Sequence, residues 1–265
     1  MRMAEKVANL CKIAPVAGGQ LRSMKSEVNQ KTNRLLASLP DSEQDELLGR
    51  METVSLQKRA VLWEQGARAA YVYFPDSATV SLTTLVEDGS SVEIATVGNE
   101  GALGLGVFLG AERALARAIV QSPGVARRIE TAVFQQTLVQ SPALNRIILR
   151  YTQALLFQIT RAAGCNRFHS LEQRCARWLL TVADRGDTQE LPLTQEFLSE
   201  MLGATRQAAG VAIEGMVKRG LIQTSRGTIR LLDRAGLEAA SCECYRVVKE
   251  DLEQFLLWLP PTSRS

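Results

Sequence analysis

The sequence changes its hydrophobic period near Pro142, and this change constrains the fold more than any other feature. Residues 51–140 contain short runs rich in Val, Ile, Thr and Tyr, separated by turn residues. The turn residues are Gly66, Pro75-Asp76, Asp88-Gly89, Gly98-Asn99 and Pro123-Gly124. Short strands with such turns are typical of an antiparallel sandwich or barrel, whereas the apolar residues after Pro142 recur at helical spacing. The pattern predicts an α+β fold with an N-terminal antiparallel β-domain followed by helices.

Composition is that of an ordinary globular protein and argues against a membrane protein. The chain has 265 residues, of which 46% are hydrophobic and 22% charged, and this length predicts two domains with their own cores. The longest uncharged apolar run, Gly101–Ala111, is shorter than the roughly 20 residues of a membrane-spanning helix. The net charge of +3 alone indicates no particular partner. We expect a cytoplasmic protein without a membrane partner.

Five cysteines are an odd number without the spacing of a disulfide framework, which indicates free thiols in a reducing compartment. They are Cys11, Cys165, Cys175, Cys242 and Cys244. Cys242 and Cys244 form a Cys-x-Cys pair, for which zinc binding is the alternative interpretation. A closed zinc site needs about four ligands, and the only histidine of the chain, His169, lies well away in the sequence. We therefore expect buried or idle thiols and no metal site.

Both ends of the chain are predicted to be tails. Residues 1–32 are expected to be a flexible N-terminal tail, in which Met24 is an alternative start. Lys12 interrupts the apolar stretch that a signal peptide would need. Residues 259–265 are the expected C-terminal tail. Residues 33–50 carry leucines in a pattern that predicts a pair of short helices before the β-domain.

A long helix is predicted over residues 142–164, with a length of roughly 33 Å. One side of it carries a seam of residues spaced four and three apart, as in a coiled coil. The seam residues are Leu144, Ile148, Tyr151, Leu155, Gln158 and Ala162. The helix can pack on its own sheet or pair with a second subunit. We favour a dimer interface formed by the seam, because Ile147, Leu156 and Ile159 leave further apolar surface. Gly164 is expected to mark the joint to the next helix.

Residues 193–222 have the pattern of two short helices separated by Gly203. Thr194 and Thr205 stand where the N-cap residues of the two helices are expected, and Gly203 permits the positive φ of a tight turn. Apolar residues of the two helices can form one small core. They are Phe197, Met201, Ile213 and Met216. This pattern predicts a helix–turn–helix.

The second of these helices leaves one side without large apolar residues, and this side suits a DNA major groove. Arg206 can donate two hydrogen bonds to guanine or pair with a phosphate, and Gln207 can bond the edge of adenine. Gly210 lets the backbone approach closely, and Val211 can contact a thymine methyl group. The other interpretation is a helical hairpin with a solvated basic face.

A β-hairpin is predicted directly after this helix, with Arg226-Gly227 at its turn. A hairpin in this place is a wing, whose basic residues can contact phosphates. Between Thr205 and Arg234 six basic residues face two acidic ones, a local charge of 6 − 2 = +4, which favours DNA binding. The expected DNA-contacting residues are Thr194, Thr205, Arg206, Gln207, Gly210, Val211, Lys218, Arg226, Thr228 and Arg230.

Together, these segments resemble the Crp/Fnr (catabolite activator) family of transcription regulators over residues 33–258. The resemblance is carried by the long helix and by LVEDGSSVEIATVGNEGALGL, LPLTQEFLSEMLGATRQAAGVAIEGMVKRGLI and GTIRLLDRAGLE. It implies an eight-stranded β-roll like that of cyclic-nucleotide-binding domains over residues 33–141. It further implies a dimerisation helix over 142–164 and a winged helix–turn–helix over 165–258. A homodimer of this kind would bind double-stranded DNA at a palindromic operator with half-sites about 34 Å apart, and would work with RNA polymerase.

The resemblance places a candidate effector pocket where this sequence departs from members that bind cyclic AMP. Those members use a Gly-Glu pair for the ribose and Arg-Ser or Arg-Thr for the phosphate. The corresponding pairs here are Gly101-Ala102 and Arg113-Ala114, so the ribose acceptor and the phosphate hydroxyl are missing. We expect that the β-roll does not bind cyclic AMP in the usual way, and an ordinary surface arginine explains Arg113 at least as well.

Metal cofactors and catalysis find little support in the sequence. The family's iron–sulfur centre needs an N-terminal cysteine cluster, where only Cys11 lies, and a haem needs an axial histidine or cysteine, which residues 51–140 lack. We expect neither group, and the effector is left unassigned. A cupin-like enzyme would need metal-binding histidines, so no catalytic residue is expected. The alternative to a DNA-binding regulator is a sensing or protein-interaction module that has lost DNA binding.

Overall fold

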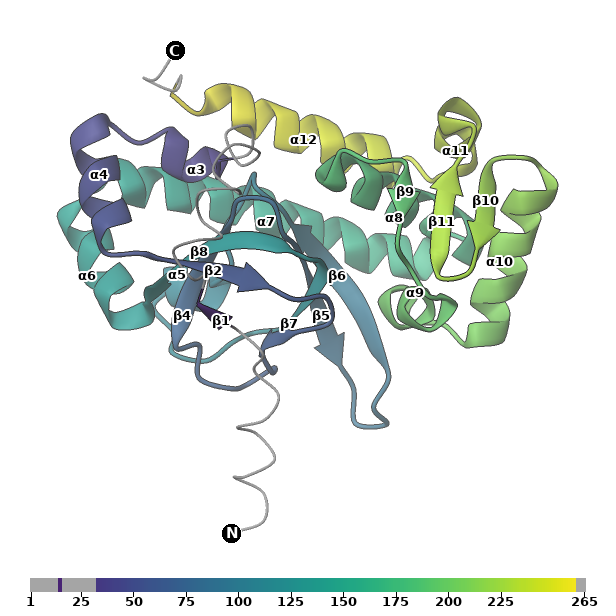
Figure 1. The fold of residues 1–265 in the computed structure, drawn as a ribbon, viewed down its shortest axis with the longest axis horizontal. Helices are drawn as coiled ribbons and strands as arrows, with labels where there is room; N and C mark the ends of the chain where they lie inside the picture. Colours follow the sequence, from purple (N-terminus) through teal and green to yellow (C-terminus); the bar gives the residue numbers. More distant parts are fainter. Residues whose placement is uncertain (1–13, 16–31, 261–265) are drawn as a thin grey trace, which may run out of the picture. The chain divides into compact units, whose positions relative to one another are not determined.

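The computed structural model describes residues 14–15 and 32–260, and the chain divides into two compact units. The first unit comprises Met1–Leu82, Thr96–Ala154 and Phe255–Ser265, and the second comprises Thr83–Ala95 and Leu155–Gln254. Figure 1 shows the helices and strands of both. The predicted tails fall mostly outside the described residues, so they stay predictions. The exception is Ala14–Pro15, which forms a short strand.

The described β-strands before the long helix form two four-stranded sheets, in the orders β1-β2-β8-β4 and β3-β7-β5-β6. Their bounds are β1 (Ala14–Pro15), β2 (Glu52–Leu56), β3 (Val61–Trp63), β4 (Tyr71–Pro75), β5 (Thr79–Leu85), β6 (Ser91–Val97), β7 (Arg117–Ser122) and β8 (Gly124–Glu130). Antiparallel pairing places Glu52 of β2 opposite Arg128 of β8, and Tyr71 of β4 opposite Glu130 of β8. The predicted antiparallel β-roll is confirmed.

Large apolar side chains of neighbouring strands fill the core of this β-roll. Val72 and Phe74 of β4 and Ile129 of β8 are almost completely buried. Polar residues that alternate with apolar ones on β5 are buried as well, because both faces of this strand are covered. Ser81 is one of them, and its hydroxyl donates to Oε1 of Gln121 at 3.3 Å.

Two helices lie within the segment for which the sequence predicted only strands: α5 (Leu105–Phe108) and α6 (Thr131–Gln140). Helix α6 buries Phe134, whose ring centroid lies 5.9 Å from that of Phe74 and 5.6 Å from that of Phe108. The prediction of β-structure up to Gln140 is therefore wrong. The Thr and Val residues of this segment favour a strand locally, but the burial of Phe134 in the aromatic core outweighs this weak preference.

The predicted pair of short helices is confirmed as α3 (Arg34–Ala37) and α4 (Asp41–Gly49). Asn33 is the N-cap of α3, and its Oδ1 accepts the backbone N–H groups of Leu35 and Leu36 at 3.1 and 3.3 Å. This cap satisfies two donors that the first turn of any helix leaves without an intrahelical acceptor.

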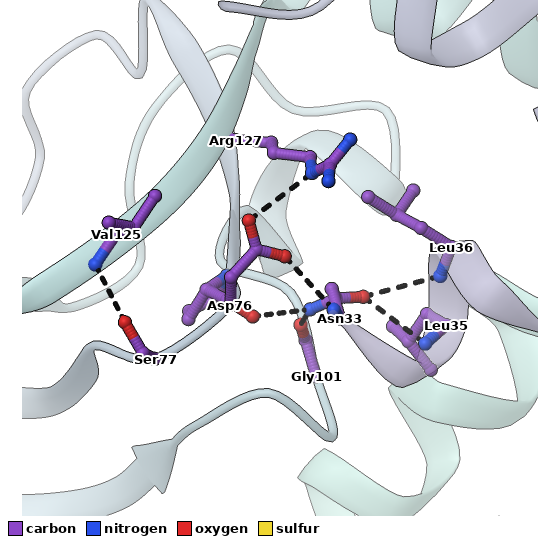
Figure 2. Close-up of polar contacts among 9 residues, drawn as sticks. Asn33, Leu35, Leu36, Asp76, Ser77, Gly101, Val125 and Arg127 are labelled. Atoms are coloured by element: carbon purple, nitrogen blue, oxygen red, sulfur yellow. Dashed lines mark hydrogen bonds and ion pairs between the residues drawn. The ribbon is translucent and has the colours of Figure 1, made fainter. Parts of the chain in front are cut away.

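Asn33 also ties the start of α3 to loops of the β-roll (Figure 2). Its Nδ2 donates to the carbonyls of Pro75 and Gly101 at 2.9 and 2.8 Å, and its backbone N–H donates to Asp76 Oδ1 at 3.0 Å. Arg127 Nε donates to the other carboxylate oxygen of Asp76 at 3.2 Å. Burial raises the pKa of Asp76, and the charge of Arg127 opposes this shift in part. Every donor of the buried Asn33 thus has an acceptor.

The long helix α7 (Pro142–Phe168) continues through Gly164, where the sequence predicted a joint. A glycine inside a helix costs only about 1 kcal/mol relative to alanine, so it need not end one. The chain turns instead at Ser170, whose hydroxyl accepts the N–H of Gln173 at 3.3 Å while the Gln173 side chain accepts the N–H of Ser170 at 3.0 Å. This capping box begins α8 (Leu171–Gly186). The predicted end of the dimerisation helix at residue 164 is too early.

The second unit contains α8, the predicted helix–turn–helix and a small sheet in the order β10-β11-β9. Its other elements are β9 (Glu190–Leu191), α9 (Gln195–Leu202), α10 (Arg206–Lys218), β10 (Ile222–Ser225), β11 (Thr228–Leu231), α11 (Arg234–Ala240) and α12 (Cys244–Trp258), whose residues from Phe255 onward belong to the first unit. The fold class predicted from the sequence is confirmed. Over the part of the chain that the structure describes, no helix has the length and apolar character needed to cross a membrane.

Candidate nucleic-acid interface

Two threonine caps and one glycine shape the helix–turn–helix as the sequence predicted. Thr194 Oγ1 accepts the N–H of Phe197 at the start of α9, and Thr205 Oγ1 accepts the N–H of Ala208 at the start of α10, both at 3.2 Å. Gly203 ends α9 with φ of 59°. A Cβ atom at Gly203 would also lie 2.9 Å from the Cβ of Val92. Glycine is therefore required there for its backbone angle and for its lack of a side chain.

One side of α10 is completely buried in the second unit. Ala209 and Met216 have no exposed surface, and Ala212 and Ile213 have almost none. The facing residues of α9, among them Phe197, are equally buried. This shared core fixes the orientation of α10, because turning the helix would expose these side chains to water.

The opposite side of α10 is open, and it carries the residues that the sequence assigned to DNA. The side chain of Arg206 is 66% exposed, and Val211 is exposed to the same fraction. Gln207 is exposed as well, and no atom lies within 4 Å of the Cβ position of Gly210. Val211 is mostly exposed, so this face is open to a partner.

The wing follows α10 as predicted, and it has one strand more than the sequence indicated. In the hairpin, Ile222 of β10 pairs with Leu231 of β11, and Gly227 takes φ of 75° in the turn. The additional strand is β9, in which Leu191 pairs with Ile229. No sequence pattern indicated β9, because its two residues follow a polar linker and are too few to show alternation.

Two of the expected DNA-contacting arginines are paired with carboxylates in the free protein. Arg206 Nη2 lies 2.5 Å from Glu196 Oε1, and Arg230 Nε lies 3.1 Å from Glu190 Oε1. All four side chains are more than half exposed. Solvent-exposed pairs of this kind contribute only about 0–1 kcal/mol, so both arginines can exchange their carboxylate for a phosphate or a base.

Other basic residues of this region support the fold. Arg219 pairs with Glu172, and Arg234 pairs with Asp184, so both side chains join their segment to α8. The arginines of this region have five acidic partners, and with these included six basic side chains face seven acidic ones. The local charge of +4 counted along the sequence thus overstates the net charge of these groups. Among the described residues, the basic side chains of this region without an ion pair are Lys218 and Arg226.

The predicted dimer seam of α7 is buried within a single chain. Five of its residues are at most 7% exposed, namely Leu144, Ile148, Tyr151, Leu155 and Ala162. The ring of Tyr151 packs 6.4 Å from that of Phe108 and 6.1 Å from that of Phe255, between ring centroids. Gln158 is half-buried. The seam is thus the face by which α7 packs on its own chain, and its contact with a second subunit stays a prediction.

A different side of α7 carries exposed apolar residues. Leu149 and Leu156 expose 57% and 45% of their surface, and their separation of seven residues places them on the same side of the helix. Ile147, which was expected to be free apolar surface, is buried. The side of α7 marked by Leu149 and Leu156 is therefore the one that leaves large apolar residues exposed.

The candidate effector residues have partners within the first unit. A Cβ atom on Gly101 would overlap the ring and hydroxyl of Tyr151, so this position requires glycine for packing. Arg113 is exposed, and its Nη1 donates to the carbonyl of Gly66 at 2.8 Å. The buried members of the set are Ala102 and Ala114. The structure thus gives Gly101 and Arg113 roles in the fold.

A buried polar pair in the second unit was not predicted from the sequence. Trp178 Nε1 donates to Oε1 of Glu93 at 3.0 Å, and both side chains are buried. A buried carboxylate is stable only with such donors. The two residues are 85 positions apart, so no local pattern connects them, and the only available signal was a glutamate among the buried positions of a strand.

Two family models match the chain in the order of its domains. A model of the cyclic nucleotide-binding domain matches residues 53–141, and a model of the Crp-like helix-turn-helix domain matches residues 173–240. The first match spans most of the β-roll and α6, and the second spans α9, α10 and the wing. A search of the curated proteins finds no match.

Solved structures of similar fold come from several bacteria. FixK2 from Bradyrhizobium japonicum has a TM-score of 0.63 at 17% identity, covering 72% of this chain and 98% of its own. The c-di-GMP responsive global regulator CLP from Xanthomonas campestris has a TM-score of 0.61 at 20% identity, covering 72% and 99%. A CRP-family transcriptional regulator from Thermus thermophilus has a TM-score of 0.61 at 18% identity, covering 71% and 95%.

The two matches thus follow the β-roll and the winged helix–turn–helix along the chain, one before and one after the long helix. The residues that the models match include the β-roll and the open face of α10. This chain belongs to the Crp/Fnr family of transcription regulators, and it is not an enzyme.

Proposed function

We propose that this regulator binds double-stranded DNA sequence-specifically as a homodimer, with α10 in the major groove of each half-site of a palindromic operator. The observation that supports this most is the division of α10 into two sides. Ala209, Ile213 and Met216 are buried, while Arg206 and Gln207 project from the exposed start of the helix. In helix–turn–helix proteins it is this N-terminal part that reaches the base edges.

The helix caps and the wing supply contacts to phosphates in this proposal. The hydroxyls of Thr194 and Thr205 each accept one backbone N–H, and each keeps its own proton to donate to a phosphate oxygen. Arg226 and Thr228 lie at the turn of the wing, and Lys218 lies at the end of α10. These contacts fix the register on the duplex, while Arg206, Gln207 and Val211 distinguish the bases.

The proposed dimer contact is the side of α7 that carries Leu149 and Leu156. Two exposed leucines two turns apart are typical of a helix that pairs with a second helix. The replacement of both by glutamate should give a monomer in sedimentation equilibrium. Leu109, which is 56% exposed outside α7, gives the matched control, and its replacement by glutamate should leave the dimer intact. A dimer that survives L149E/L156E would place the interface elsewhere.

We infer that the β-roll does not bind cyclic AMP in the usual way. Ala102 has no carboxylate for a ribose hydroxyl, Ala114 has no hydroxyl for a phosphate, and Arg113 already donates to the Gly66 carbonyl. One relative of similar fold, CLP, is described as c-di-GMP responsive, which supports the idea that another ligand can act through this fold. Calorimetry with cyclic AMP should show no binding at micromolar concentrations, and a micromolar dissociation constant would refute the inference.

The central experiment is the selection of bound fragments from genomic DNA, followed by gel-shift titration of one selected duplex at several salt concentrations. We expect an inverted repeat in the selected fragments and an affinity that falls steeply with salt, because phosphate contacts release counterions. A failure to shift any duplex at low salt would favour the alternative, in which the domain senses a ligand or binds protein without DNA.

A further inference from the structure

Four side chains with metal-binding atoms converge in the second unit, at the junction of α7, α11 and α12. Cys165 lies on α7, His169 follows one helical turn later, Cys242 lies between α11 and α12, and Cys244 begins α12. One ligand atom from each of these residues lies within 4.8 Å of the others. The sequence predicts no zinc site, because His169 lies far from Cys242 and Cys244 along the chain. In the folded protein these residues are close together.

We propose that Cys165, His169, Cys242 and Cys244 bind one zinc ion in a closed tetrahedral site. Three thiolates and one imidazole are a common ligand set of structural zinc. Around such an ion, two sulfur atoms lie roughly 3.8 Å apart, and a sulfur and a nitrogen roughly 3.5 Å apart, given the usual bond lengths. The Sγ atoms of Cys165 and Cys242 are 3.5 Å apart, and Sγ of Cys244 is 3.7 Å from Nδ1 of His169. These two separations are close to those of a tetrahedral site, and every other pair of ligand atoms lies within 4.8 Å.

The orientation of His169 fits a metal ligand. Its Nδ1 faces the cysteines, and its Nε2 lies 3.1 Å from Oε2 of Glu243. A carboxylate at Nε2 holds the proton on that nitrogen, so Nδ1 keeps a free lone pair for the metal. Metal-binding histidines commonly have such a carboxylate partner, which fixes the tautomer and the ring orientation. Glu243, which stands between Cys242 and Cys244 in the sequence, is thus a positioning residue for the His169 ring.

The surroundings of the site suit a cluster of negative charge. Three thiolates exceed the charge of one Zn²⁺ by one unit, and two arginines of α8, Arg174 and Arg177, lie close enough to interact with Cys165. Their Nε atoms are buried and have no hydrogen-bond acceptor within the described residues. Their positive charges would offset the excess negative charge of the site.

Two alternatives to zinc, idle thiols and a disulfide, explain fewer features of the cluster than a zinc site does. Cys175 shows what an idle thiol looks like here: it is buried, and it lies outside the cluster. A disulfide between Cys165 and Cys242 would leave Cys244 and His169 without a role. Zinc uses all four side chains and joins the end of α7 to the start of α12.

The test begins with metal analysis of the full-length protein, purified under reducing conditions and reconstituted with Zn²⁺. We expect one zinc per chain by mass spectrometry. Replacement by Co²⁺ should give the ligand-field bands of tetrahedral cobalt together with thiolate charge-transfer absorption. A wild-type protein that takes up no zinc, or the mass loss of a Cys165–Cys242 disulfide in the reduced preparation, would overturn the proposal.

Variants then assign the ligands. C165S and C244S should abolish the cobalt charge-transfer absorption or reduce it with a large loss of affinity, whereas C175A, which removes a buried thiol outside the cluster, should retain it. E243Q should weaken Zn²⁺ binding by roughly 10- to 100-fold without changing the stoichiometry. Metal binding unchanged in C165S and C244S would refute the site. These measurements use no DNA, so their outcome is independent of the proposed operator binding.

Discussion

The open face of α10 and the Cys/His cluster at the junction of α7 and α12 differ in how far the sequence predicts them. The sequence predicts the open face, and it does not predict that the four residues of the cluster lie close together. The residues of the first stand within one helix, Arg206–Lys218, and their spacing alone places them on one side. The residues of the second come from two segments, and Cys165 and Cys242 are 77 positions apart. Helical periodicity brings the first set together, and only tertiary folding brings the second set together.

The two regions differ in a second respect, namely in how complete they are within one chain. The cluster contains four ligands with suitable distances and a carboxylate behind His169. The α10 face contains donors without acceptors, apart from the exposed pair of Arg206 with Glu196. A closed set of ligands suits a stabilising ion, whereas an open set of donors suits an external partner. Separate changes to the two regions can test this contrast.

The largest effect is expected from the removal of zinc. If free Zn²⁺ is present at 1,000 times its dissociation constant, it stabilises the folded chain by about 4 kcal/mol. A chelator should therefore lower the midpoint of thermal unfolding of the wild-type protein strongly, and added Zn²⁺ should restore it. The same chelator should have no effect on C165S/C244S, whose midpoint should already be low. If the wild type has the same midpoint with and without chelator, the Cys/His cluster does not bind a stabilising ion, and the contrast between a closed and an open set of residues fails.

The next effect concerns the α10 face. R206A should weaken binding to a selected operator by about 1–3 kcal/mol, roughly 5- to 150-fold, because a bidentate contact to a base is lost. Arg246 is the matched control, since its side chain is also 66% exposed and paired with a glutamate, Glu250, at 2.9 Å. R246A should leave the affinity unchanged in the same gel-shift titration. Equal losses in the two variants would indicate a general charge effect in place of a specific contact.

The sequence predicted most of the second unit because its signals are local. Thr194 and Thr205 cap their helices, Gly203 takes the positive φ, and Gly227 turns the wing, all as expected. Each of these features is a local one, formed by residues at most four positions apart in the sequence. The antiparallel β-roll was predictable for the same reason, from turns and short runs.

The sequence is a weaker guide where burial depends on distant residues. The seam of α7 has the spacing of a coiled coil, but periodicity shows only that a side is apolar, and it does not identify what covers that side. Tyr151 packs against Phe108 and Phe255, one earlier and one much later in the chain. Helix α6 was missed because the partners of Phe134 lie in other elements. The Cys/His cluster is hidden in the sequence, because its two segments are far apart along the chain and meet only in the folded protein.

The smallest effect, and the one that separates fold from function most cleanly, is expected at Gly210. Nothing lies within 4 Å of its Cβ position, so G210A should raise the free energy of unfolding by up to about 1 kcal/mol through helix propensity. The added methyl group should nevertheless weaken operator binding, because it stands on the face that approaches the duplex. Chemical denaturation and gel-shift titration measure the two effects in one variant.

Gly215 provides the control on the same helix. Its Cβ position lies 3.4 Å from Oε2 of Glu172, an ordinary contact on the side of α10 that faces α8, so G215A should change stability by a similar small amount and leave DNA affinity unaltered. Opposite changes in stability and affinity for G210A alone would show that helix stability and DNA contact make different demands at this position. If G210A binds the operator as tightly as the wild type, the backbone of α10 does not approach the duplex at Gly210, and base recognition must be confined to the side chains at the start of the helix.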